Sequence, residues 1–172
     1  MTRRDILKAS LAVAGGGLVQ SAMAQTAKTV RTPVLDIGYE ESGSSFPVIV
    51  LHGFPDDAHA YEEVAPPLVK AGYRVLAPYL RGYGPTRFLD PKAPRMAVQA
   101  AIGQDVIDFA DALKLDRFAV AGYDWGGRAS CIATALHPER VRAGVFISGN
   151  LIQNTVDAAP PSSPMMEIGR AH

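Results

Sequence analysis

Asp124 stands between glycines in the run Gly-Tyr-Asp-Trp-Gly-Gly at residues 122–127. The apolar residues 117–121 before it predict a β-strand, and residues 128–136 after it predict a helix. Glycines on both sides allow the chain to reverse sharply, because they lack the side chains that would block a tight corner. We therefore expect Asp124 to project from a strained strand-to-helix turn, near the positive end of the helix dipole.

A carboxylate at such a corner is chemically informative, because it is ionised at neutral pH and needs no base to activate it. It can displace a leaving group from an alkyl carbon and form an alkyl-enzyme ester. Attack on the carbonyl of an amide or an ester would instead give an anhydride, which is a poor route to hydrolysis. Asp124 therefore favours epoxide opening or carbon–halogen cleavage over the chemistry of a peptidase or a lipase.

The elements that must position Asp124 alternate between strand and helix patterns. Two short strands are expected at residues 32–35 and 37–39, and a continuous apolar run predicts a buried strand at 47–51. Further strands are expected at 73–77, 117–121 and 141–148. Helices are expected at 60–70, where Pro66 and Pro67 should disturb the helix, at 95–114 and at 128–136. This alternation indicates an α/β domain with a parallel sheet.

The composition excludes several classes of protein. Apolar residues make up 48% of the chain, which is ordinary for a folded globular domain. Lys and Arg together number 17, as do Asp and Glu, so the basic excess typical of nucleic-acid binding is missing. Cys131 is the only cysteine, which excludes an internal disulfide, and the four histidines are too scattered to predict a metal site.

Three motifs together resemble the epoxide hydrolase branch of the α/β-hydrolase superfamily. They are His-Gly-Phe-Pro at 52–55, Arg-Gly-Tyr-Gly at 81–84 and the run around Asp124, in the order and spacing typical of that family. The resemblance implies an α/β-hydrolase fold, with a mostly parallel sheet and helices on both faces, cut off after about the sixth strand. It also implies that Asp124 is the catalytic nucleophile and that no cofactor or metal is needed.

The same resemblance assigns roles to residues around the nucleophile. The backbone N–H groups of Phe54 and Trp125 would form the oxyanion hole that stabilises negative charge during hydrolysis of the ester. Trp125, His52 and Pro55 would contact the substrate. The expected partner is a small epoxide, which would be opened to a vicinal diol.

Two alternatives remain open. A haloalkane dehalogenase could use the same Asp-Trp corner, with a halogenated substrate and the indole N–H of Trp125 as a halide ligand. Other dehalogenase groups fit less well, because they place Asn where this chain has Phe54 or Arg where it has Trp125. The second alternative is a non-catalytic remnant, because the base and acid of the family's mechanism find no counterpart in this sequence.

The resemblance also implies a domain organisation. In the family, a His that activates water, an acid that orients it and two cap tyrosines all follow the strands found here. We therefore interpret residues 25–150 as the N-terminal part of the hydrolase core and residues 151–172 as the start of a connection to a cap domain. The chain would then be a fragment of a larger enzyme and inactive by itself.

The first 24 residues resemble a twin-arginine signal peptide of bacteria. Arg3 and Arg4 precede an apolar stretch that is too short to span a bilayer, and Ala22-Met23-Ala24 supplies the small residues of a cleavage site. The resemblance implies export by the twin-arginine machinery, cleavage without a stable membrane anchor, and a periplasmic or secreted location.

Overall fold

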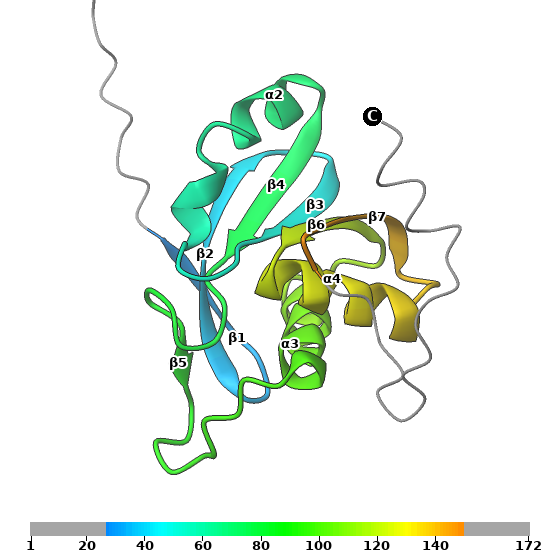
Figure 1. The fold of residues 1–172 in the computed structure, drawn as a ribbon. Helices are drawn as coiled ribbons and strands as arrows, with labels where there is room; N and C mark the ends of the chain where they lie inside the picture. Colours follow the sequence, from blue (N-terminus) through cyan, green and yellow to red (C-terminus); the bar gives the residue numbers. More distant parts are fainter. Residues whose placement is uncertain (1–26, 150–172) are drawn as a thin grey trace, which may run out of the picture.

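The computed structural model describes residues 27–149, which form a central β-sheet flanked by helices (Figure 1). The strands are β1 (Lys28–Arg31), β2 (Leu35–Gly43), β3 (Phe46–Leu51), β4 (Tyr73–Pro78), β5 (Arg87–Phe88), β6 (Phe118–Tyr123) and β7 (Val141–Ile147). The helices are the 3₁₀ helix η1 (Ala58–Tyr61), α2 (Ala65–Lys70), α3 (Gln99–Ala112) and α4 (Trp125–Leu136). The expected signal peptide and the expected connection to a cap lie outside the described residues.

The sheet has seven strands, six of them in the continuous order β1-β2-β4-β3-β6-β7, while β5 pairs with β2. The strands β4, β3, β6 and β7 pair in parallel, whereas β1, β2 and β5 join by antiparallel pairing. The predicted α/β-hydrolase fold is confirmed, and the six strands on the path match the number expected from the sequence. The two-residue strand β5 is an addition that the apolar pattern did not predict.

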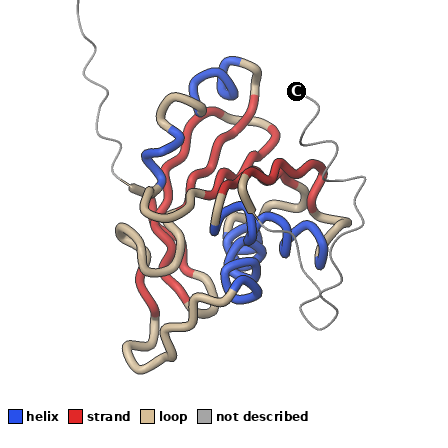
Figure 2. Tube along the Cα trace, in the orientation of Figure 1, coloured by secondary structure: helices blue, strands red, loops and turns tan. Residues whose placement is uncertain are grey.

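Alternate side chains of the central strands build two separate cores. In β3, Ile49 and Leu51 belong to the core cluster that contains residues of α3 and α4. Val48 and Val50 belong to the cluster on the opposite face, where side chains of η1 and α2 pack. Helices therefore cover both faces of the sheet, as predicted (Figure 2). Each large apolar side chain buried in this way contributes about 1.5–3 kcal/mol.

Three helices begin at other residues than the sequence predicted. The expected helix at 60–70 is divided, because η1 ends at Tyr61 and α2 starts at Ala65. Pro66 and Pro67 lie in the first turn of α2, where a missing N–H costs no hydrogen bond, so they start this helix rather than disturb it. The helix expected at 95–114 covers only residues 99–112, and the one expected at 128–136 begins directly after Asp124.

Of the two short strands expected from the sequence, the one at 32–35 was placed wrongly, whereas residues 37–39 lie inside the longer strand β2. The structure has β1 ending at Arg31 and β2 starting at Leu35. Thr32 turns the chain between them: its hydroxyl donates to the Leu35 carbonyl at 2.9 Å and accepts the Leu35 N–H at 3.0 Å. A side chain that satisfies the backbone in this way forms a local turn that no apolar pattern reveals.

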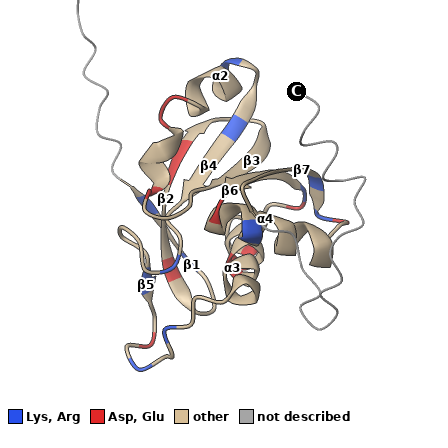
Figure 3. Ribbon diagram, in the orientation of Figure 1, with Lys and Arg blue, Asp and Glu red and all other residues tan. Residues whose placement is uncertain are grey.

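Charged residues of both signs are interspersed along the strands, helices and loops (Figure 3). This distribution agrees with the equal numbers of basic and acidic residues in the sequence. Within residues 27–149, no helix has both the length and the apolar character that crossing a membrane requires.

Candidate active site

Two of the sequence motifs meet at the carboxyl ends of neighbouring strands. β3 and β6 pair in parallel, and this register sets Leu51 opposite Gly122. The loop that starts at His52 and the corner at Asp124 therefore leave the sheet side by side. In open α/β sheets, ligands bind at this carboxyl edge.

The corner at Asp124 has the strained backbone that the glycines predicted. Asp124 has φ 51° and ψ −118°, a conformation that costs a non-glycine residue about 1–3 kcal/mol. A Cβ atom on Gly122 would lie 2.4 Å from the backbone of Gly126, and one on Gly126 would lie 2.0 Å from the Leu51 carbonyl oxygen. Both glycines are therefore required for the corner to pack against β3.

The carboxylate of Asp124 is turned toward the loop after β3. It makes no capping hydrogen bond with α4, and its Oδ1 accepts the backbone N–H of Phe54 at 3.0 Å. This hydrogen bond is the main cause that lowers the pKa of Asp124, opposed by partial burial and assisted by the Trp125 amide and the Arg128 charge. The Asp124 carboxylate is therefore ionised throughout the neutral range.

The backbone amide of Trp125 acts on the Asp124 carboxylate less strongly than the amide of Phe54. It lowers the pKa of Asp124 less than the amide of Phe54 does, and Phe54 makes the hydrogen bond of 3.0 Å to that carboxylate. The indole packs against the core cluster of α3 and α4. The guanidinium of Arg128 lies over the Trp125 ring, 4.8 Å from its centre. An indole contact with substrate or halide stays a prediction.

The buried position of His52 does not favour the predicted contact with substrate. Its side chain is 0% exposed, and its Nε2 accepts the Leu80 N–H at 3.1 Å. Nδ1 then carries the proton and donates to the Gly53 carbonyl at 3.1 Å. Burial lowers the pKa of His52, so the ring is neutral, and Tyr83 packs edge-on against it at 4.7 Å. His52 thus joins two loops beneath the site.

Phe54 and Pro55 lie on the exposed side of the same loop. The Phe54 side chain is 70% exposed, although its backbone N–H is held by Asp124. Pro55 is also exposed, and the peptide bond that joins it to Phe54 is cis. Both side chains are free to meet a ligand, and the predicted contact of Pro55 with substrate stays a prediction.

Two residues beside Asp124 were not predicted from the sequence. Arg128 lies one helical turn after Asp124 and its charge acts on that carboxylate, a relation that the four-residue spacing on α4 could have signalled. Tyr123 donates its hydroxyl to Oδ2 of Asp56 at 2.6 Å. These two residues are 67 positions apart, and no local pattern in the sequence signalled their contact.

The histidines of the described residues lie away from the place of a general base for Asp124. Besides the buried His52, His59 lies in η1 and pairs with Asp57 at 2.8 Å. His137 caps the far end of α4. Within residues 27–149, the candidate site therefore consists of Asp124, the Phe54 N–H that donates to its carboxylate and the groups that hold them.

The fold and this corner can be compared with known proteins. A family model described as "alpha/beta hydrolase fold" matches residues 47–170. The chain therefore belongs to the α/β hydrolase fold family.

Epoxide hydrolases are among its similar relatives. One from Caballeronia sordidicola is 31% identical over 114 residues, which are 66% of this chain and 34% of that protein. Epoxide hydrolase A of Mycobacterium tuberculosis is 36% identical over 120 residues, 69% of this chain and 35% of the relative. The crystal structure of a proposed epoxide hydrolase from Klebsiella pneumoniae has a TM-score of 0.73 and 41% identity, covering 84% of this chain and 49% of the other. The chain thus spans a third to a half of the length of these relatives.

Proposed function

We propose that the protein is an epoxide hydrolase in which Asp124 attacks a ring carbon of the substrate. The observation that carries this proposal is the position of the Asp124 carboxylate, which leaves the helix uncapped and receives the N–H of Phe54 instead. The named activity of the relatives supports the choice of an epoxide over a halogenated compound.

The contacts of Asp124 suggest separate roles for its two oxygens. Phe54 donates to Oδ1, and we assign the attack to Oδ2, which accepts no hydrogen bond of the kind seen from Phe54 among residues 27–149. Attack forms a bond between Oδ2 and the ring carbon and breaks the carbon–oxygen bond of the epoxide. The released alkoxide takes up a proton and becomes the first hydroxyl of the diol. Oδ1 is then the carbonyl oxygen of an ester that already accepts the Phe54 N–H.

Hydrolysis of this ester completes the reaction. Water adds to the ester carbonyl carbon, and negative charge develops on Oδ1, where the Phe54 donor already stands. Collapse of this intermediate releases the diol and leaves the oxygen of that water in the Asp124 carboxylate. One preorganised donor of this kind lowers such a barrier by about 2.7–4 kcal/mol.

The water must lose a proton to a base in this second step. We propose that a His, oriented by an acid, supplies this base from outside the described residues, and that tyrosines of a cap protonate the epoxide oxygen. The reaction then needs no cofactor, because carboxylate, water and proton transfer account for every bond that changes.

The resemblance of residues 1–24 to a signal peptide leads to a proposal on location. We propose that the twin-arginine machinery exports the protein to the periplasm or beyond. Fractionation of the bacterial source should find the protein outside the cytoplasm, and a strain without the twin-arginine translocase should retain it inside. Equal export by both strains would contradict the proposal.

The activity is tested by incubating the full-length protein with styrene oxide and, separately, with 1-chlorobutane. We expect vicinal diol from the epoxide, and we expect Asp124→Ala to abolish it. Asp116→Ala, which changes an exposed aspartate, is the matched control and should keep the activity. Halide release without diol would favour a dehalogenase, and no product from either compound would favour a non-catalytic protein.

A further inference from the structure

A second hydrogen bond joins the two loops of the site beside the one between Phe54 and Asp124. Tyr123 directly precedes the nucleophile, Asp56 follows the oxyanion donor by two residues, and the Tyr123 hydroxyl donates to Asp56. We propose that this Tyr123–Asp56 bond is a positioning tie that holds the N–H of Phe54 against Asp124. The inference deepens the proposed function and depends on it for the catalytic step alone.

The geometry of the tie is that of a closed ring. The chain runs from Tyr123 to Asp124, crosses to Phe54 through the 3.0 Å hydrogen bond, continues to Asp56, and returns to Tyr123 through the 2.6 Å hydrogen bond. Two hydrogen bonds that close one ring constrain each other, so losing one gives the loop freedom to lengthen the other. The position of the oxyanion donor therefore depends on the phenol.

Gly53 is a second point at which the two loops approach closely. A Cβ atom there would lie 2.6 Å from the Asp124 Cβ and 3.0 Å from the Tyr123 carbonyl oxygen. The loop thus touches the corner at Gly53 and at Asp56, and Phe54 lies between these two contacts.

The tie connects a rigid element to an exposed one. Tyr123 ends β6, and its ring lies beside Tyr61, with ring centres 6.2 Å apart, in the core on the α2 face. Phe54, Pro55 and Asp56 are exposed, so side-chain packing does little to fix them. A bond from the sheet is therefore well placed to fix this part of the loop.

The protonation of Tyr123 suits a permanent donor. Partial burial and the Asp56 carboxylate raise the pKa of Tyr123 to about 12. The phenol therefore keeps its proton over the range in which the enzyme would work.

The test separates positioning from stability with substitutions that remove or keep single hydrogen-bonding groups. Tyr123→Phe removes only the donor, Asp56→Ala removes the acceptor, and Asp56→Asn keeps an acceptor oxygen. Tyr61→Phe is the matched control, since it removes a hydroxyl that donates to the Leu51 carbonyl at 2.8 Å, from a neighbouring ring outside the site.

Two quantities are measured on the full-length protein: the pKa of Asp124, by NMR of ¹³C-labelled aspartate, and the single-turnover rates of ester formation and ester hydrolysis. Tyr123→Phe should raise the pKa of Asp124 and slow ester hydrolysis by roughly tenfold or more, because a displaced donor no longer meets the developing charge. Ester formation should change less. Asp56→Ala should slow hydrolysis similarly, the double variant should be no slower than either, and Asp56→Asn should stay close to the unchanged protein.

The outcomes that overturn the inference are distinct from failure of the proposed function. If Tyr123→Phe leaves the pKa of Asp124 unchanged, or if Tyr61→Phe has the same effects, the phenol is structural and the inference is wrong. If the unchanged protein forms no ester, epoxide hydrolysis through Asp124 fails, but the NMR comparison still decides whether the tie positions the Phe54 amide.

Discussion

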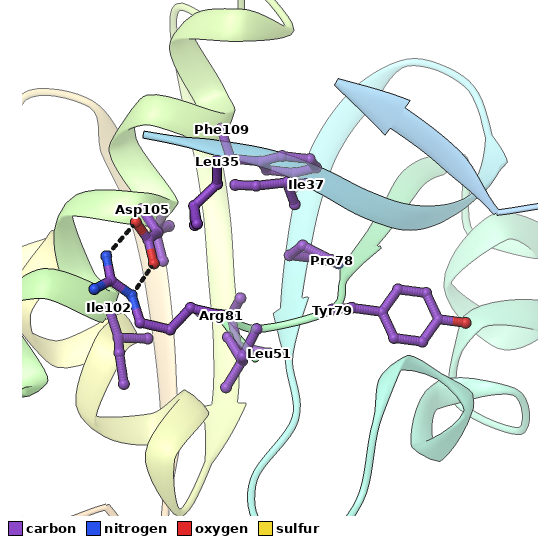
Figure 4. Close-up of a pocket in the computed structure, with 11 residues that line it drawn as sticks. Leu35, Ile37, Leu51, Pro78, Tyr79, Arg81, Ile102, Asp105 and Phe109 are labelled. Atoms are coloured by element: carbon purple, nitrogen blue, oxygen red, sulfur yellow. Dashed lines mark hydrogen bonds and ion pairs between the residues drawn. The ribbon is translucent and has the colours of Figure 1, made fainter. Parts of the chain in front are cut away.

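Replacing Arg81 with leucine should destabilise the fold by about 3–5 kcal/mol, because it leaves the carboxylate of Asp105 buried without its partner. The two side chains form a two-pronged ion pair, with both nitrogen–oxygen distances at 2.7 Å (Figure 4). They are only 9% and 10% exposed. Arg81 also donates to the carbonyls of Met96 and Ala101, at 2.6 Å and 3.1 Å, so it ties its loop to the start of α3.

The surroundings of the ion pair explain why removing Arg81 should cost more stability than removing the partner of an ordinary hydrogen bond. The cavity beside it, lined by Leu35, Ile102 and Phe109 among others, holds about 10 Å³, so at most about one water could replace the guanidinium. Burial raises the pKa of Asp105 even while Arg81 lowers it. Without Arg81, the carboxylate keeps the cost of burial and loses the compensation.

The assay is unfolding by urea, followed through the fluorescence of Trp125, the only tryptophan in the chain. The loss should shrink as the pH falls, because the folded-state pKa of Asp105 in the variant lies above its unfolded value and protonation removes the buried charge. The double variant Arg81→Leu/Asp105→Leu should recover most of the stability. Arg95→Leu is the control: Arg95 stacks on Phe88 at 4.2 Å in an exposed loop and should matter by less than about 1 kcal/mol.

Two results would refute this reasoning. One is a loss below about 1 kcal/mol for Arg81→Leu, which would mean that the buried carboxylate finds another way to be solvated. The other is a double variant that is no more stable than the single one, which would mean that the ion pair stabilises the fold by itself.

Three further predictions concern the site. His52→Leu should lower the free energy of unfolding by about 1–3 kcal/mol, measured in urea, because the Leu80 N–H loses its acceptor; an unchanged midpoint would contradict it. Gly53→Ala should lower the turnover rate of styrene oxide by a much larger factor than it lowers the folding equilibrium constant, because its Cβ would displace the Asp124 side chain. Equal factors would contradict this prediction. The folded-state pKa of Asp124 is lowered, so the stability from its hydrogen bond is present above the ordinary aspartate pKa and is lost as pH falls through the lowered value. Ester formation should lose rate over that same low range, and an acid limb at or above the ordinary aspartate pKa would refute this.

The parallel strands could be predicted because each is rich in apolar residues, most uniformly in β3, which is largely buried, although most residues of β7 are exposed. β3, β4, β6 and β7 all fall within one or two residues of the predicted runs. The first antiparallel strand and the start of the second could not be placed, because the turn at Thr32 between them depends on side-chain bonds to the backbone. The start of α2 was missed because prolines were taken as interruptions, whereas the first turn of a helix accepts them.

In the candidate site, too, local features could be predicted from the sequence and long-range contacts could not. The corner at Asp124 could be predicted because its glycines are local in sequence, and their spacing has a steric reason. The hydrogen bond from Phe54 spans 70 residues, and only the resemblance to a family suggested it. His52 was expected to contact the substrate because it lies in a site motif, whereas the backbone groups that occupy both its nitrogens are seen only in the folded protein.

The most direct measurement of the central claim is a single turnover of styrene oxide by excess full-length protein in water enriched in ¹⁸O. Mass spectrometry of the peptide that contains Asp124 then reports where the heavy oxygen goes. Attack by Asp124 followed by ester hydrolysis predicts one ¹⁸O in its carboxylate and none in the first diol molecule. Heavy oxygen in that diol, with an unlabelled Asp124, would show that water opens the epoxide directly and would contradict the account.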